Sequence, residues 1–106
     1  MPTDTVSVFG YVVDESTRTP LPTVQVYVEG SLQGGALTDR SGRYQLALPQ
    51  TGNYRIVALL LDAHSDPFEV AVTAEPVRVD FTLDLDRAVP GCRLWVADNA
   101  YQYECR

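Results

Sequence analysis

The stretch ALTDRSGRYQLAL, residues 36–48, carries the clearest local signal of the fold. Asp39 stands at the first position and Gly42 at the fourth position of a potential type I turn. At these positions an aspartate carboxylate can accept backbone N–H bonds, and glycine can adopt a left-handed conformation. A calcium loop would need about six to eight oxygen ligands, which is more than this segment offers. We therefore predict a tight β-hairpin with Asp39 and Gly42 as its turn residues.

Alternation between apolar and polar residues extends from this turn in both directions. Tyr44, Leu46 and Leu48 fall on one side of the strand that follows it. Such a two-residue period is typical of β-strands with one buried face. The predicted strands are residues 5–13, 23–29, 43–48, 53–61, 68–73 and 77–86. The run at 53–61 is apolar on both faces after its third residue, which is typical of a central strand.

The spacing of turn-forming residues sets the fold class. They recur about every 8–12 residues, and no segment shows an apolar period of 3.6 residues that would predict a helix. We predict an all-β, Ig-like antiparallel sandwich of about seven strands in two packed sheets. A chain of 106 residues is near the commonest size of a single domain. We expect residues 1–86 to form the sandwich and residues 87–106 a hairpin appended to it.

Composition and charge exclude several function classes. Hydrophobic residues make up 45% of the chain and charged residues 21%, which is typical of a globular protein. The net charge is -6, so a nucleic-acid backbone or an anionic membrane surface would be repelled. The longest apolar run, residues 56–61, is far short of a membrane span. We expect no nucleic-acid partner and no membrane insertion by this segment.

Several ordered segments together carry a family resemblance. They are TPLPTVQVYVEG (19–30), TDRSGRYQL (38–46), TGNYRIVA (51–58) and VRVDFTLDL (77–85), preceded by Gly10 in the first strand. Over about residues 5–86 the chain resembles the carboxypeptidase regulatory-like domain family, which has a prealbumin-like β-sandwich fold. Thr23 stands where most members of that family have a small residue, usually glycine. The resemblance implies a non-catalytic accessory module, of the kind found beside peptidase domains and in bacterial surface and secreted proteins.

The residues that could support catalysis or bind a metal are few. His64 is the only histidine, whereas zinc sites need three or four ligands. Ser65 and Asp66 follow it directly, but neighbours in sequence do not have the geometry of a catalytic triad, and no nucleophile-elbow motif is present. The aspartates of 77–86 share one strand face, which is typical of a solvated surface. We expect no enzyme, no cofactor and no metal, and a hydrolase would require a pocket that gathers His64 with carboxylates.

The C-terminal stretch CRLWVADNAYQYEC, residues 92–105, predicts a second hairpin. If Asp98 and Asn99 form a two-residue turn, Cys92 lies opposite Cys105 as a non-hydrogen-bonded pair. At that site the Cα atoms are close enough for a disulfide. Closing a loop of this size contributes about 3 kcal/mol in the chain-entropy model. Because disulfides are rare in the cytosol, we expect an extracytoplasmic protein that is periplasmic, cell-surface or secreted.

The two faces of this hairpin differ in character. Leu94 and Val96 share an apolar face with Tyr101 and Tyr103, whereas Trp95 points to the other side. The apolar face could dock on the sandwich as an extra pair of strands, or it could cover an exposed edge strand. Aromatic residues supply a large contact area with a polar edge, so they are also candidates for binding. The candidate binding surface consists of Trp95, Tyr101, Tyr103 and Tyr27.

Three hypotheses about function follow from these observations. The first is a non-catalytic accessory or interaction module of a secreted or cell-surface bacterial protein, which supports or docks a neighbouring domain or a protein partner. The second is a carbohydrate-binding module that uses exposed aromatic residues, Trp95 above all. The third and weakest is a small hydrolase built around His64.

Overall fold

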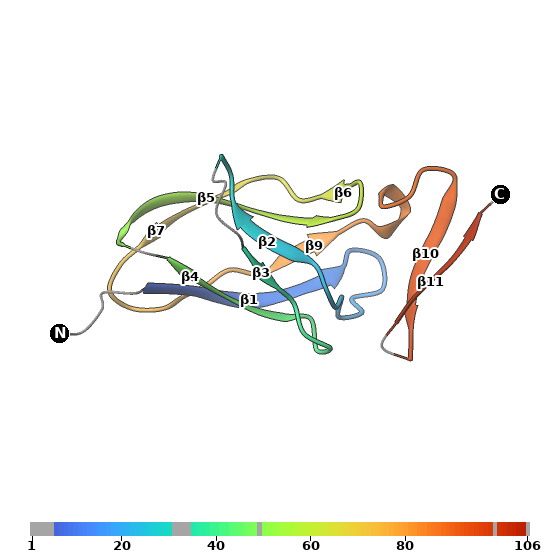
Figure 1. Ribbon diagram of the computed structural model, residues 1–106, viewed down its shortest axis with the longest axis horizontal. Helices are drawn as coiled ribbons and strands as arrows, with labels where there is room; N and C mark the ends of the chain where they lie inside the picture. The colour runs from blue at the N-terminus through green and yellow to red at the C-terminus, as the bar shows by residue number, and fades with distance from the viewer. Residues whose placement is uncertain (1–5, 31–34, 49, 99, 106) are drawn as a thin grey trace.

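The computed structural model describes residues 6–30, 35–48, 50–98 and 100–105. These residues form strands and one turn of 3-10 helix, η1 (Leu85–Arg87) (Figure 1). The strands are β1 (Val6–Asp14), β2 (Gln25–Val28), β3 (Ala36–Leu37), β4 (Arg43–Leu48), β5 (Gly52–Leu60), β6 (Ala63–His64), β7 (Phe68–Val72), β8 (Val77–Arg78), β9 (Phe81–Leu83), β10 (Cys92–Ala97) and β11 (Ala100–Cys105). Within the described residues no helix is long and apolar enough to span a membrane.

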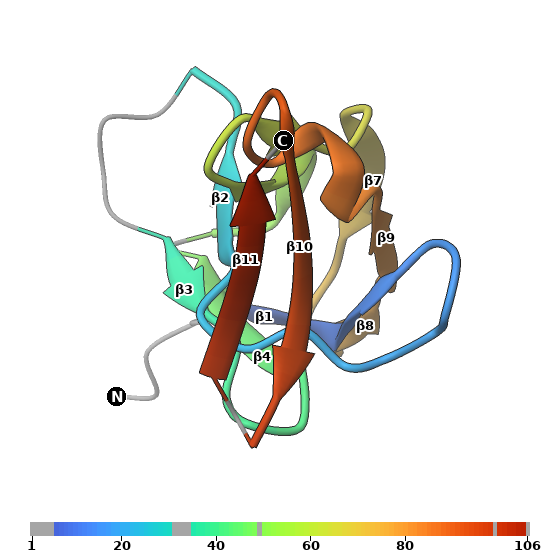
Figure 2. The ribbon, with the colours of Figure 1, turned by 90° about the vertical axis from the view of Figure 1, so that its right-hand side faces the viewer.

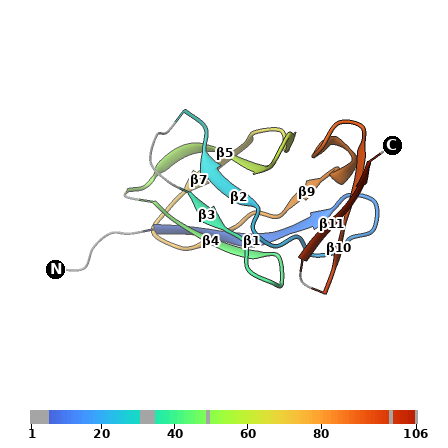
Figure 3. The same cartoon turned by 45° about the vertical axis from the view of Figure 1, so that its right-hand side comes forward.

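Two sheets pack face to face, which confirms the predicted sandwich (Figures 1 and 3). The first has the order β4-β1-β8, and β9 also pairs with β1; the second has the order β3-β2-β5-β6, and β7 also pairs with β5. β5 is central, as its two apolar faces predict. The pairs of β1 with β8 and β9 are parallel, unlike the other pairs. Parallel neighbours need a crossover connection, and here the chain crosses between the sheets from β7 to β8.

The core follows the predicted alternation. In β4 Tyr44, Leu46 and Leu48 are buried and the alternate residues are exposed. The largest fully buried side chains come from both sheets and from the loop before β2; they are Leu21, Ile56, Leu83, Val8, Val12, Val24 and Val26. The predicted strand 77–86 also buries alternate residues, but its backbone is divided into β8, β9 and η1.

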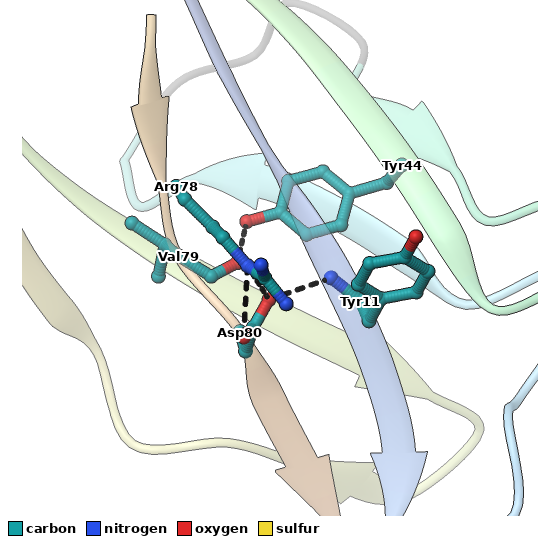
Figure 4. Close-up of polar contacts among 5 residues, drawn as sticks. All are labelled: Tyr11, Tyr44, Arg78, Val79 and Asp80. Atoms are coloured by element: carbon teal, nitrogen blue, oxygen red, sulfur yellow. Dashed lines mark hydrogen bonds and ion pairs between the residues drawn. The ribbon is translucent and has the colours of Figure 1, made fainter.

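Figure 4 shows the polar contacts at the break between β8 and β9. The backbone N–H of Tyr11 donates to Asp80 Oδ1 at 2.9 Å, so a side chain replaces a backbone acceptor in the ladder. The carbonyl of Val79 accepts a hydrogen bond from the Tyr44 hydroxyl. A Cβ on Gly10 would lie 2.0 Å from the Val79 oxygen, which explains the glycine in this strand. Burial, with a smaller contribution from Asp80, raises the pKa of the Tyr44 hydroxyl above its usual value.

The predicted turn residues Asp39 and Gly42 lie in a tight turn before β4, but the β-hairpin predicted around this turn is wrong. β3 pairs with β2 in the second sheet and β4 pairs with β1 in the first, so the turn carries the chain from one sheet to the other. The Gly42 N–H donates to the Asp39 carbonyl at 2.9 Å, and Gly42 has a φ of 75°. Asp39 Oδ1 accepts the N–H groups of Ser41 at 2.8 Å and Arg43 at 3.1 Å. The carboxylate therefore serves local backbone groups, as the type I turn pattern requires.

Thr23 occupies a left-handed backbone conformation, with a φ of 55°. This conformation is costly for a β-branched residue and free of strain for glycine. The segment around Thr23 is fixed by the buried Thr38. The hydroxyl of Thr38 donates to the Leu21 carbonyl at 2.6 Å and accepts the Val24 N–H at 2.9 Å.

Candidate functional site

The C-terminal hairpin has the predicted register and the predicted disulfide. β10 and β11 pair antiparallel through six residue pairs, from Cys92 opposite Cys105 to Ala97 opposite Ala100. The two cysteines are bonded, with a Cα–Cα distance of 4.0 Å. Asp98 has a φ of 53°, which suits the expected turn, and Asn99 lies outside the described residues.

The hairpin crosses the end of the sandwich, as Figure 2 shows from that side. Among the described residues its strands pair only with each other, so it does not extend a sheet of the sandwich. Instead it covers the open end of the core. Leu94 is 7% exposed within the core cluster, and Val96 and Tyr101 pack against that cluster. β10 begins just after η1 at this end of the molecule, so the apolar face of the hairpin meets core residues there.

Tyr101 joins the hairpin to the strained segment before β2. Its hydroxyl donates to the carbonyl of Pro22, which also accepts the Thr23 hydroxyl at 2.7 Å. Burial raises the pKa of Tyr101 to about 12, although a hydrogen bond with Thr23 acts in the opposite direction. The protonated hydroxyl is therefore available as a donor across the neutral pH range. Tyr101 serves as an anchor of the hairpin rather than as a free surface residue.

A cleft of about 380 Å³ lies beside the docked hairpin. Its walls come from β10, from the β1–β2 loop and from the segment of η1. The lining residues are Asp14, Ser16, Thr17, Thr19, Asp84, Leu85, Asp86, Arg93, Leu94, Trp95 and Val96. Trp95 is 37% exposed, and the guanidinium carbon of Arg93 lies 5.9 Å from the centre of its ring. We refer to this site as the Trp95 cleft.

The four predicted aromatic residues do not form one surface. Trp95 lines the cleft, whereas Tyr101 points toward the sandwich. Tyr103 is 71% exposed and lies outside the cleft lining, and Tyr27 is half-buried on β2. Sequence reasoning identified Trp95 but missed the loop and η1 residues around it. Their grouping depends on where the hairpin docks, which no local pattern in the sequence specifies.

His64 lines a different cleft, of about 360 Å³, together with Asp66, Asp80 and other polar residues. Its Nδ1 atom lies 3.3 Å from the backbone oxygen of Ser65. The Ser65 hydroxyl oxygen accepts the Ala58 N–H at 3.0 Å, so it is occupied by the backbone. No group of three or more histidine, cysteine or acidic residues in the described part of the chain is placed to hold a metal. The arrangement thus brings His64 near carboxylates without the contacts of a triad.

Comparisons with known proteins agree with the fold. The model of the CarboxypepD_reg-like domain matches residues 8–88. A search of curated proteins finds no match to this sequence. One similar structure is a chain of a type II cohesin–X-dockerin complex from Acetivibrio cellulolyticus, a C-terminal interface mutant. It has a TM-score of 0.62 and 20% identity, over 81% of this chain and 62% of that chain.

Two further structures are similar. An N-terminal interface mutant of the same type of complex has a TM-score of 0.55 and 23% identity, over 72% of this chain and 52% of that chain. A candidate carbohydrate-binding protein from Bacteroides uniformis has a TM-score of 0.50 and 19% identity, over 99% of this chain and 54% of that chain. The sequence thus spans less than two thirds of each of these chains, and at these identities the likeness concerns the fold.

Proposed function

We propose that this chain, which belongs to the CarboxypepD_reg-like domain family, is a non-catalytic interaction module of a secreted or cell-surface bacterial protein. In this proposal residues 1–86 form the supporting sandwich, and residues 87–106 form the element that docks a neighbouring domain or a partner. The observation that carries the proposal is the hairpin at the end of the sandwich. It is cross-linked, anchored through Tyr101, and exposes Tyr103 and part of Trp95.

Three further observations support this function. Exposed aromatic side chains on a rigid element are typical of binding surfaces. The disulfide favours an oxidising compartment, where a cell-surface or secreted module would fold. Two of the similar structures are chains of cohesin–X-dockerin complexes, which are assemblies of proteins. Within the described residues, the Ser65 side chain accepts a hydrogen bond from the Ala58 N–H and has none with His64 or a carboxylate, which argues against a hydrolase.

The test is binding to an identified partner. The chain is immobilised, the proteins captured from the culture medium or envelope fraction are identified, and each purified candidate is titrated against the free chain. Tyr103→Ala is the test variant, because this side chain is exposed and contributes little to the core. Leu37→Ala is the matched control, because Leu37 is a large apolar residue, 64% exposed, on β3 of the second sheet.

We expect Tyr103→Ala to weaken binding of a genuine partner about tenfold or more, as for an aromatic contact residue. Leu37→Ala should leave it within about twofold. A partner whose affinity falls with Leu37→Ala and not with Tyr103→Ala would contradict docking through the hairpin.

A second candidate function is carbohydrate binding, and the Trp95 cleft is the observation that favours it. The cleft combines one aromatic ring with hydroxyl and carboxylate groups in a volume typical of small-ligand sites. One of the similar structures is a candidate carbohydrate-binding protein. Its test is the titration described in the next subsection.

A further inference from the structure

We infer that the Trp95 cleft is a subsite for one uncharged pyranose ring. The ring would stack on Trp95, and its hydroxyl groups would donate hydrogen bonds to the polar wall formed by Asp14, Thr19 and Asp86. This inference rests on the second candidate function and deepens it, because it assigns a ligand class to particular atoms. It does not depend on docking of a protein to Tyr103.

The polar wall consists mainly of hydrogen-bond acceptors. This follows from which group donates and which accepts in each of its hydrogen bonds. Asp14 is 7% exposed, and its Oδ2 atom lies 2.7 Å from the Thr17 hydroxyl. A carboxylate only accepts, so Thr17 is the donor in this pair. The Thr17 and Thr19 hydroxyl oxygens are 2.8 Å apart. Because the single hydroxyl proton of Thr17 is already used, Thr19 must donate to Thr17, and the Thr19 oxygen remains an acceptor.

The other polar groups of the lining extend this pattern. Asp84 Oδ1 already accepts the Asp86 N–H at 3.0 Å, whereas no hydrogen bond or ion pair to the Asp86 carboxylate is present among the described residues. Arg93 provides a fork of donors at the same cleft. A complementary ligand must therefore donate several hydrogen bonds and accept a few. Sugar hydroxyls do both.

The apolar part of the lining favours a ring-shaped ligand. Trp95 lines the cleft together with Leu94 and Val96 of β10 and Leu85 of η1. An aromatic side chain offers a flat apolar surface with a polar edge, which suits the C–H face of a pyranose. The cleft volume of about 380 Å³ is in the range of small-molecule sites, which begins at about 300 Å³.

The charges of the lining argue against other ligand classes. Three aspartates stand against Arg93 in this cleft, so a phosphate or carboxylate ligand would meet net repulsion. The Arg93 guanidinium lies 5.9 Å from the centre of the Trp95 ring, so a cationic ligand at this ring would meet a like charge. An uncharged ligand avoids both penalties.

Trp95 also provides the assay, because it is the only tryptophan of the chain. The probes are cellotetraose, mannotetraose and tetra-N-acetylchitotetraose, all uncharged, with N-acetylarginine amide as a cationic control at matched ionic strength. Each is titrated against the intact chain by tryptophan fluorescence and by calorimetry. We expect at least one tetrasaccharide to change the Trp95 emission and to release measurable heat. Titration with the soluble polysaccharide and with a glycoprotein bearing the same sugar then distinguishes the two natural sources.

Variants assign the site, with calorimetry as the readout because Trp95→Ala removes the fluorophore. We expect Trp95→Ala to weaken saccharide binding about tenfold or more, and Trp95→Phe to retain part of the affinity. Asp86→Asn should weaken it as well, because an amide replaces an acceptor-only group. Leu37→Ala is the control, because Leu37 is exposed and lies outside the cleft lining, and it should leave the saccharide affinity within about twofold. Circular dichroism and the thermal midpoint verify that each variant is folded.

Three results would overturn this inference: no tetrasaccharide binding at millimolar concentration, unchanged saccharide affinity in folded Trp95→Ala, or a response to N-acetylarginine amide alone. The interaction module would survive each of them, because it is tested separately through Tyr103. Conversely, if the chain binds a saccharide and no protein partner, the proposed subsite is supported and the proposed interaction module is contradicted.

Discussion

Removing the disulfide should destabilise the whole chain if the hairpin and the sandwich unfold together. Cys92 and Cys105 are 13 positions apart. Closing a loop of this size lowers the entropy of the unfolded chain, which stabilises the folded state by about 3 kcal/mol. Serine replacement at both positions adds little further cost, since Cys105 is exposed and Cys92 is only half-buried. For 106 residues the unfolding entropy near the midpoint is about 220 cal/mol/K. The expected fall in Tm is therefore about 13 °C.

The assay compares the wild-type chain with the Cys92→Ser/Cys105→Ser variant by calorimetry and by guanidinium unfolding. Tryptophan fluorescence reports on the hairpin through Trp95, and far-UV circular dichroism reports mainly on the two larger sheets. We expect coincident transitions by both probes, shifted together in the variant. An early fluorescence transition with an unchanged circular dichroism midpoint would refute the reasoning. It would mean that the hairpin undocks from the sandwich as an independent unit.

Three other changes test separate parts of the structure. Gly10→Ala should lower the free energy of unfolding by about 3 kcal/mol or more, because its Cβ would lie 2.0 Å from the Val79 oxygen; a loss below about 1 kcal/mol would contradict this packing. Thr23→Gly should raise the free energy of unfolding by about 0.5–1 kcal/mol in guanidinium unfolding, because relief of the left-handed backbone strain exceeds the entropy cost of glycine. A destabilised variant would argue against strain at Thr23. The hydroxyl of Tyr101 loses its proton near pH 12 when folded and near pH 10 when unfolded, so its contribution is complete below pH 10 and is lost as the pH rises through 12. Urea unfolding from pH 9 to 12 should show this loss in the wild-type chain and a smaller one in Tyr101→Phe, and equal losses would contradict the burial of the hydroxyl.

Local patterns predicted a large part of this structure for a physical reason. A strand has a side-chain period of two, so one turn fixes the register of the hairpin around it. A two-residue turn predicted at 98–99 was enough to place Cys92 opposite Cys105, and the structure confirms this pairing. The burial of alternate residues in β4 likewise follows from the pattern alone.

The remaining features depend on contacts between segments that are distant in the sequence. The Tyr11 N–H bonds to Asp80, which is 69 positions away, and the Tyr101 hydroxyl bonds to Pro22, which is 79 positions away. The alternation of apolar and polar residues in 77–86 could not reveal that the Asp80 carboxylate would accept a backbone hydrogen bond from β1 and interrupt the strand. The Trp95 cleft could not be predicted either, because its walls meet only after the hairpin has docked on the end of the sandwich.

The most direct test of the central claim is amide hydrogen exchange of the chain, alone and bound to its identified partner or neighbouring domain. If the hairpin-capped end is the binding surface, exchange should slow in residues 92–105 and in the adjoining β1–β2 loop upon binding. The amides of β7, on the second sheet away from the hairpin, should be unaffected (Figure 1). Protection concentrated in β7 with no change in residues 92–105 would contradict the account.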